Sequence, residues 1–207
     1  MRTWPFTLLA PLWLATVCTP LVAEEGFRPL FDGKTLAGWR GDPELWSVED
    51  GTIVGSTDEK RIAKNSFLST EDEFENFVLE LKFKLRNGNS GVQVRSRTAG
   101  DFVVHGYQAD IAEQRYMGIL YDEGGRRGIL ADVDPEEVQP LVRQGDWNEY
   151  RITVDGPRIT LLLNGHTTVD FTETEADGAK RGIIALQLHV GPPMRIAFKD
   201  IQIKPLP

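Results

Sequence analysis

The side chains of this sequence best suited to chemistry are planar polar groups at alternating positions. They occur as the pairs Glu80 and Lys82, Gln93 and Arg95, Gln108 and Asp110, and Gln187 and His189. Amides, a carboxylate, a guanidinium and an imidazole form directional hydrogen bonds, which suits a ligand with many hydroxyl groups. If these segments are neighbours, their side chains form one concave polar wall. The alternative is an exposed, charge-paired sheet in which Arg95 bridges to Asp110.

Other catalytic patterns are weaker. Glu71, Glu73 and Glu75 have the alternate spacing of a carboxylate pair on a strand, but their acidic run favours a solvated turn. The sequence contains no G-x-S-x-G, H-E-x-x-H or phosphate-loop motif. The acidic run 132–137 favours a charged loop, with Ca²⁺ binding as the alternative. We therefore expect no cofactor, and a structural or catalytic divalent cation such as Ca²⁺ stays open.

The segments that would position these groups have a period of two residues, and helical periodicity is nearly absent. Apolar and polar residues alternate in 46–54, 77–86, 92–97, 107–111, 150–163, 169–171 and 184–189. Asp50-Gly51 and Asn164-Gly165 are hairpin signals, and the change of parity between Phe198 and Ile201 requires a β-bulge. This pattern predicts an all-β antiparallel sandwich or barrel. The stretch 115–144 has no clear period and is expected to be a long functional connection.

Composition limits the class of protein. The chain has 207 residues, 41% hydrophobic and 26% charged, which is typical of one folded domain. Its formal net charge of −8 argues against nucleic acid or an anionic membrane as a partner. Cys18 is the single cysteine, so no disulfide framework is expected.

The first 23 residues differ from the rest. A basic start at Met1-Arg2 precedes an apolar run that Pro11 and Pro20 interrupt. This run is too short for a membrane span, so we predict a secretory signal peptide cleaved after Ala23. Residues 24–207 are then a single exported domain, periplasmic or extracellular, without a membrane span.

A series of short motifs resembles the 3-keto-disaccharide hydrolase domain family. The motifs are Phe31-Asp32-Gly33-Lys34-Thr35-Leu36 with Gly38-Trp39, Asn89-Ser90-Gly91-Val92, Gly106-Tyr107-Gln108-Ala109-Asp110-Ile111, Trp147-Asn148-Glu149-Tyr150, Leu163-Asn164-Gly165, Leu186-Gln187-Leu188-His189 and Phe198-Lys199-Asp200-Ile201. They occur in family order from Phe27 to Leu206. One departure is Leu188, where many members have an aspartate.

The resemblance implies a concanavalin A-like jelly roll and exported bacterial proteins that act on sugars oxidised at C3. A ketone at C3 acidifies the C2 proton, so the group at C1 can leave by elimination before water adds. This route needs a base, an oxyanion partner and an acid. On this basis Asp110 or His189 is expected as the base, with the other, or Glu113, as the acid, and Arg95 as the oxyanion partner.

The remaining expected contacts are with the sugar itself. Glu80, Gln93, Gln108 and Gln187 are expected to bind hydroxyl groups, and Tyr116 and Tyr121 to stack on a sugar ring or pack in the core. The expected partner is a carbohydrate, and no pattern specifies an oligomeric state. A non-catalytic carbohydrate-binding module is the alternative, and a structural module of the cell envelope is a third reading. The alternation of side chains along each strand also predicts that one sheet face holds Glu80, Arg95, Asp110 and His189.

Overall fold

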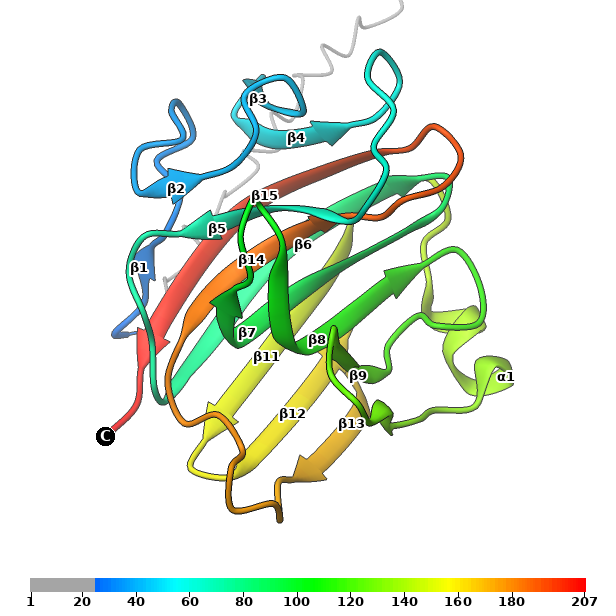
Figure 1. Ribbon diagram of the computed structural model, residues 1–207. Helices are drawn as coiled ribbons and strands as arrows, with labels where there is room; N and C mark the ends of the chain where they lie inside the picture. The colour runs from blue at the N-terminus through cyan, green and yellow to red at the C-terminus, as the bar shows by residue number, and fades with distance from the viewer. Residues whose placement is uncertain (1–24) are drawn as a thin grey trace, which may run out of the picture.

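The computed structural model describes residues 25–207, and the expected leader at 1–23 lies outside that part of the chain. Two antiparallel β-sheets are stacked face to face (Figure 1), and within residues 25–207 the helical residues are confined to α1 (Pro135–Val138) and the 3₁₀ turn η1 (Gln139–Leu141). The all-β sandwich predicted from the two-residue period is therefore confirmed.

The first sheet, sheet A, has eight strands. Its order is β13 (His166–Thr172), β12 (Arg158–Leu163), β11 (Asn148–Asp155), β6 (Phe77–Arg86), β15 (Arg195–Pro205), β4 (Thr52–Ser56) and β3 (Trp46–Glu49), and β1 (Arg28–Pro29) also pairs with β15. β6 lies between β11 and β15, with Tyr150 opposite Leu81 and Phe198 opposite Phe83.

The second sheet, sheet B, has seven strands. Its order is β10 (Gly128–Ala131), β9 (Leu120–Glu123), β8 (Val104–Ala112), β7 (Asn89–Thr98), β14 (Ile183–Leu188), β5 (Ser66–Thr70) and β2 (Trp39–Arg40). β7 and β8 form a long hairpin, and β14 returns from the far end of the chain to pair with β7. The motif-bearing strands β7, β8 and β14 are therefore adjacent.

The core lies between the two sheets and takes one side chain in two from each strand. From β6 it takes Phe77, Leu79, Leu81 and Phe83, and from sheet B it takes Val92, Val94, Ala109, Ile111, Leu186 and Leu188. All of these side chains are buried. Because one face of each strand is fixed in this way, the alternate residues must point to the outer face of their sheet.

The predicted turns are present. Asn164 and Gly165 have φ angles of 50° and 83°, and Asp50 and Gly51 have 46° and 76°. Two successive positive φ angles are the signature of a type I′ hairpin turn. The predicted bulge in the last strand lies between Lys199 and Gln202, where Asp200 has φ 52°.

The stretch 115–144 contains more regular structure than expected. β9 and β10 extend sheet B beyond β8, and α1 begins at Pro135 with Asp134 as its N-cap. A strand of four residues contains only two alternations of apolar and polar side chains, so the sequence alone cannot distinguish such a strand from a loop.

A charged cluster joins the two sheets near β10 and β13. Arg127 donates to both carboxylate oxygens of Glu173, at 3.0 and 2.8 Å, and the Tyr107 hydroxyl donates to Glu173 at 2.6 Å. Hydrogen bonding from Arg127 lowers the pKa of Glu173 to about 2, and burial raises the pKa of Tyr107 to about 12. We interpret this cluster as a structural link between β8 and β13.

Candidate functional site

The outer face of sheet B brings several of the predicted polar residues together. Gln93 on β7 lies opposite Gln108 on β8, and Gly91 lies opposite Asp110. Gln187 on β14 points to the same face, because its chain neighbours Leu186 and Leu188 are in the core. A Cβ atom on Gly91 would lie 2.5 Å from Cδ of Gln108, so Gly91 provides the space that this amide occupies.

These side chains form one hydrogen-bonded network, which we call the amide network (Gln93, Gln108, Asp110 and Gln187). Gln93 Nε2 donates to Gln108 Oε1 at 3.2 Å. Gln108 Nε2 donates to Asp110 Oδ1 at 2.6 Å and to Gln187 Oε1 at 3.3 Å. Two buried atoms, Gln93 Oε1 and Gln187 Nε2, have no hydrogen-bond partner. An unsatisfied buried donor and acceptor are costly, and a polar ligand could satisfy them.

Asp110 is the ionisable member of the amide network. It is 4% exposed. Burial raises the pKa of its carboxyl group to about 8, the hydrogen bond from Gln108 opposes this shift, and the negative charge of Glu123 adds to it. From the core side, the Tyr150 hydroxyl donates to the backbone carbonyl of Asp110 at 2.6 Å and fixes the strand there. A buried carboxyl that titrates near neutral pH is a candidate acid or base.

The tip of the β7–β8 hairpin (residues 97–105) folds back over part of the outer face of sheet B and contacts Gln93 of the amide network. The Phe67 amide of β5 donates to the carbonyl of Phe102 at 2.8 Å, although β7 and β14 separate β5 from β8 in the sheet. Gln93 Nε2 also contacts the carbonyl of Val104, at 3.3 Å, and Val104 packs with Phe67 and Ala185. Figure 1 shows this hairpin rising in front of sheet B.

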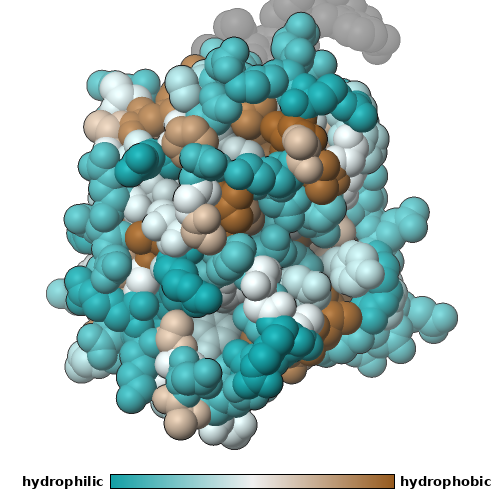
Figure 2. Space-filling model, viewed as in Figure 1, coloured by the Kyte–Doolittle hydropathy of each residue, from teal (hydrophilic) through white to brown (hydrophobic). Residues whose placement is uncertain are grey.

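The space-filling view of the same side shows how this face differs from a uniformly solvated sheet. Apolar and weakly polar residues gather in its middle and upper part, between hydrophilic margins (Figure 2). The small buried cluster of Phe67, Val104, Ile183 and Ala185 lies on this outer side, separate from the main core. Sheet B therefore carries both polar and apolar groups beneath the hairpin tip.

Two residues that the sequence analysis did not select lie beside the amide network. Asn65 Nδ2 donates to Glu123 Oε1 at 2.9 Å, and Asn65 Oδ1 accepts from the Val190 amide at 2.9 Å. Glu123 ends β9 within the stretch that lacked a period, and Asn65 lies in a loop, so no alternation marked either residue. Asn65 thus connects the end of β9 to the segment that follows β14.

Arg95 does not share the face of Asp110, so the predicted grouping is wrong for this residue. The β7–β8 register shifts between Val94 and Arg97, and Arg95 has φ 46°. This bulge turns its side chain away, and its guanidinium donates to the carbonyls of Glu75 and Gly156 and to Asn76 Oδ1 at 2.6, 2.7 and 2.7 Å. Burial lowers the pKa of Arg95. The buried cation connects β7 to two turns of the sandwich.

Glu80 is also misplaced by the predicted grouping, because its strand belongs to the other sheet. It lies on the outer face of sheet A, where it pairs with Arg151 and accepts from Gln202 Nε2 at 2.8 Å. Parity correctly places Glu80 opposite the core, but parity alone cannot tell which of two sheets a strand joins. The expected single face of Glu80, Arg95, Asp110 and His189 therefore does not exist.

The other predicted residues are distributed as follows. His189 directly follows β14 and is half-buried, with its Nδ1 2.6 Å from the Val190 carbonyl. Tyr121 lies opposite Gln108 and shares its face. Glu113 accepts from the Asn87 amide at the β6–β7 turn, and Tyr116 is 46% exposed beside Arg115. Tyr121 and His189 thus lie on the strands or strand ends that flank the amide network.

The acidic run 132–137 contacts neighbouring groups of the protein itself. Within residues 25–207, no group of three or more His, Cys, Asp or Glu side chains could hold a metal ion. In the acidic run, Asp132 pairs with Arg115 at 2.7 Å, and Asp134 accepts from the Glu136 amide at the start of α1. The same range contains no helix that is long and apolar enough to cross a membrane.

Comparison with known structures defines the class of protein. A candidate glycosyl hydrolase of Parabacteroides distasonis is 26% identical, with a TM-score of 0.65 over 87% of this chain and 99% of that one. A carbohydrate-binding module of Bacillus subtilis, at 15% identity, has the same fold, with a TM-score of 0.62 over 81% of this chain and 95% of that one. The chain is a jelly-roll sandwich of the kind found in these carbohydrate-active proteins.

The family follows from the sequence match. Residues 26–204 match the family described as the 3-keto-alpha-glucoside-1,2-lyase-like domain, and the chain belongs to this family. A 3-keto-disaccharide hydrolase of Bacteroides thetaiotaomicron is 28% identical over 156 residues, which are 64% of this chain and 54% of that protein. The chain thus spans about half the length of this relative. The family predicted from the motifs is therefore confirmed.

Proposed function

We propose that this protein is an exported hydrolase that cleaves 3-keto-disaccharides or other 3-keto-glycosides at the amide network. The observation that carries the proposal is the carboxyl group of Asp110, buried on the outer face of sheet B with its pKa raised to about 8. The family of the chain and the name of its Bacteroides relative support the substrate class. Fold alone would not distinguish this activity from sugar binding.

The reaction begins at the C2–H bond of the sugar. The Asp110 carboxylate takes the C2 proton, and the electrons of that bond form an enolate whose negative charge rests on the C3 oxygen. The buried Nε2 of Gln187 has no partner and can donate a hydrogen bond to that oxygen. Gln187 replaces Arg95 in this role, because the Arg95 guanidinium is already bound at the far side of β7.

The second half of the reaction breaks and then replaces the C1–O bond. The enolate electrons form the C1–C2 double bond as the glycosidic oxygen leaves with a proton, and we assign the role of proton donor to His189, directly after β14. Water then adds its hydroxyl group to C1 and gives its other proton to His189, which restores the proton donor, and the protonated Asp110 returns a proton to C2. The sum is hydrolysis, with no net change of redox state. We assign the remaining sugar contacts to Gln93, Gln108 and Tyr121, which share the face of Asp110.

The raised pKa of Asp110 makes the role of this residue testable by pH. If Asp110 is the base, only its ionised form is active, and kcat/KM should rise as pH increases through about 8. If Asp110 instead donates a proton to the leaving group, kcat/KM should fall over the same range. The sign of the change therefore assigns the role.

The alternative function is a non-catalytic carbohydrate-binding module. It is favoured by the fold shared with the Bacillus subtilis module and by the hairpin tip that folds back over part of the outer face of sheet B. The test is incubation with 3-keto and unmodified disaccharides side by side, followed by product analysis. We expect cleavage of the keto-sugar alone and its loss in Asp110→Asn. Sugar binding without cleavage by the unmutated protein would favour the binding module.

Export is a separate part of the proposal. It rests on the basic start, the short apolar run and Ala23 in the sequence. Mass spectrometry of protein from the native host should give an N-terminus near Glu24. A secreted or cell-associated product that still contains Trp4 and Trp13 would contradict it.

A further inference from the structure

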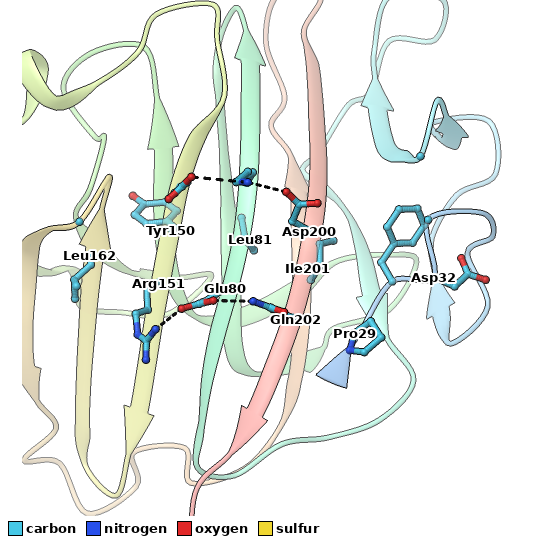
Figure 3. A pocket seen from close by; sticks show the side chains of 16 residues that line it. Pro29, Asp32, Glu80, Leu81, Tyr150, Arg151, Leu162, Asp200, Ile201 and Gln202 are labelled. Atoms are coloured by element: carbon cyan, nitrogen blue, oxygen red, sulfur yellow. Dashed lines mark hydrogen bonds and ion pairs between the residues drawn. The ribbon is translucent and has the colours of Figure 1, made fainter. Parts of the chain in front are cut away.

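A large groove lies on the outer face of sheet A, on the opposite side of the sandwich from the amide network. Its volume is about 770 Å³, which is within the range of roughly 300–1,000 Å³ typical of small-molecule sites. The floor is formed by the middle of β6, β11 and β15 (Figure 3). Pro29, residues 31–33 and Gly51 line one margin, and Leu162 and Gly165 line the other.

Two rows of paired polar side chains cross this floor. In the first row, Glu80 on β6 pairs with Arg151 on β11 and accepts from Gln202 on β15 at 2.8 Å. In the second row, Lys82 on β6 pairs with Asp200 at 2.9 Å and with Glu149 at 3.9 Å. The rows are two residues apart along β6, or about 7 Å.

The pairing of these charges indicates what kind of ligand fits. Each charged group on the floor already faces an opposite charge, and Asp32 at the margin accepts from the amides of Lys34 and Thr35. An ionic ligand would have to displace one of these partners. Neutral hydroxyl groups can instead bind the edges that remain exposed, since the side chains of Glu80 and Lys82 are 27% and 37% exposed. Pro29 and Leu162 provide apolar contacts for the C–H face of a sugar ring.

We infer that this groove is a second carbohydrate-binding site, which takes a neutral oligosaccharide and carries out no chemistry. The groove and the amide network are on opposite sheets, so a glycan bound here would hold the protein near its substrate without occupying the reactive face. The inference goes beyond the proposed activity and does not depend on it.

The test is a titration of the isotope-labelled protein, followed by the backbone amide signals of Glu80, Arg151 and Gln202. The probes are maltotetraose, cellotetraose and laminaritetraose, with inorganic phosphate as the ionic comparison. We expect at least one tetrasaccharide to shift these signals saturably and phosphate to leave them unchanged. Gln202→Ala, which leaves the Glu80–Arg151 pair in place, should weaken binding about tenfold.

Two controls separate the groove from the rest of the molecule. Thr153→Ala, on the same strand as Arg151 but outside the groove, and Asp110→Asn, on the other sheet, should both bind the tetrasaccharide as the unmutated protein does. No shift with any of the three tetrasaccharides, or unchanged affinity in Gln202→Ala, would overturn the inference. A protein that binds at the groove but never cleaves a keto-sugar would refute the proposed activity alone.

Discussion

The outer faces of the two sheets carry similar residue types but differ in burial. On sheet A, Glu80, Lys82 and Arg151 are partly exposed and form ion pairs. On sheet B, the amide network is buried, and burial raises the pKa of Asp110 to about 8. The same alternation of polar residues thus gives an exposed, ion-paired face on one sheet and a desolvated face on the other. The following changes test that difference, from the largest expected effect to the smallest.

Arg95 distinguishes a buried structural cation from a catalytic one. Arg95→Ala would remove three hydrogen bonds, to Glu75, Asn76 and Gly156, and leave a cavity in place of a side chain that is 4% exposed. We expect the free energy of unfolding to fall by about 3–5 kcal/mol in urea denaturation. The exposed neighbour Arg97 is the matched control, and Arg97→Ala should change stability by less than about 0.5 kcal/mol. If Arg95→Ala and Arg97→Ala were equally stable, Arg95 would again be a candidate ligand contact.

The buried Asp110 should lower the free energy of unfolding at neutral and alkaline pH. Between the ordinary value of 3.8 and the raised value of about 8, the folded protein holds a proton that the unfolded chain has lost, so stability falls as pH rises. Asp110→Asn removes this loss and should stabilise the protein by about 2–4 kcal/mol at pH 8 and by almost nothing near pH 4. Denaturation at the two pH values measures the change. An equal effect at both would mean that Asp110 is not desolvated.

The hairpin tip depends on close backbone contact at Gly106. This residue has φ 151°, and a Cβ there would lie 2.3 Å from Ser96 Oγ. Gly106→Ala should therefore destabilise the protein by about 1–3 kcal/mol and increase hydrogen exchange at Phe67. Gly100→Ala is the control, because it has φ 89° but open space around its Cβ position. If the two variants lose equal stability, the close contact at Gly106 is not what holds the tip.

The exposed ion pair on sheet A should matter least. Glu80→Gln keeps the shape of the side chain and removes its charge beside Arg151. The expected loss of stability is below about 1 kcal/mol and should shrink further in high salt, because solvent screens exposed pairs. A loss as large as that of Arg95→Ala would contradict the contrast between the two faces.

The strands of the sandwich could be predicted because each strand shows its buried side through alternation. The sequence correctly predicted strands β6, β7, β8, β11 and β14 and the bulge in β15. Alternation could not show which sheet β6 joins, so Glu80 was grouped with residues of sheet B. It also could not show the bulge at Arg95, which reverses one side chain without altering the residue pattern.

The contacts of the candidate site could be predicted only in part. Gln93, Gln108, Asp110 and Gln187 were selected because they alternate with core residues on three adjacent strands. Asn65 and Glu123 are held near them by tertiary contacts between a loop and the end of a four-residue strand, which leave no local signal. The burial of Asp110 depends on tertiary packing and was likewise not visible in the sequence.

Exchange of the C2 proton with solvent deuterium tests the central claim most directly, namely that the buried Asp110 on the outer face of sheet B is the base. A 3-keto-disaccharide is incubated in deuterated buffer, and label at C2 is followed by mass spectrometry with the unmutated protein, Asp110→Asn and Glu80→Gln. We predict rapid exchange with the unmutated protein and Glu80→Gln, and a loss of about 10²–10⁴-fold in Asp110→Asn. Near-normal exchange in Asp110→Asn would contradict the account.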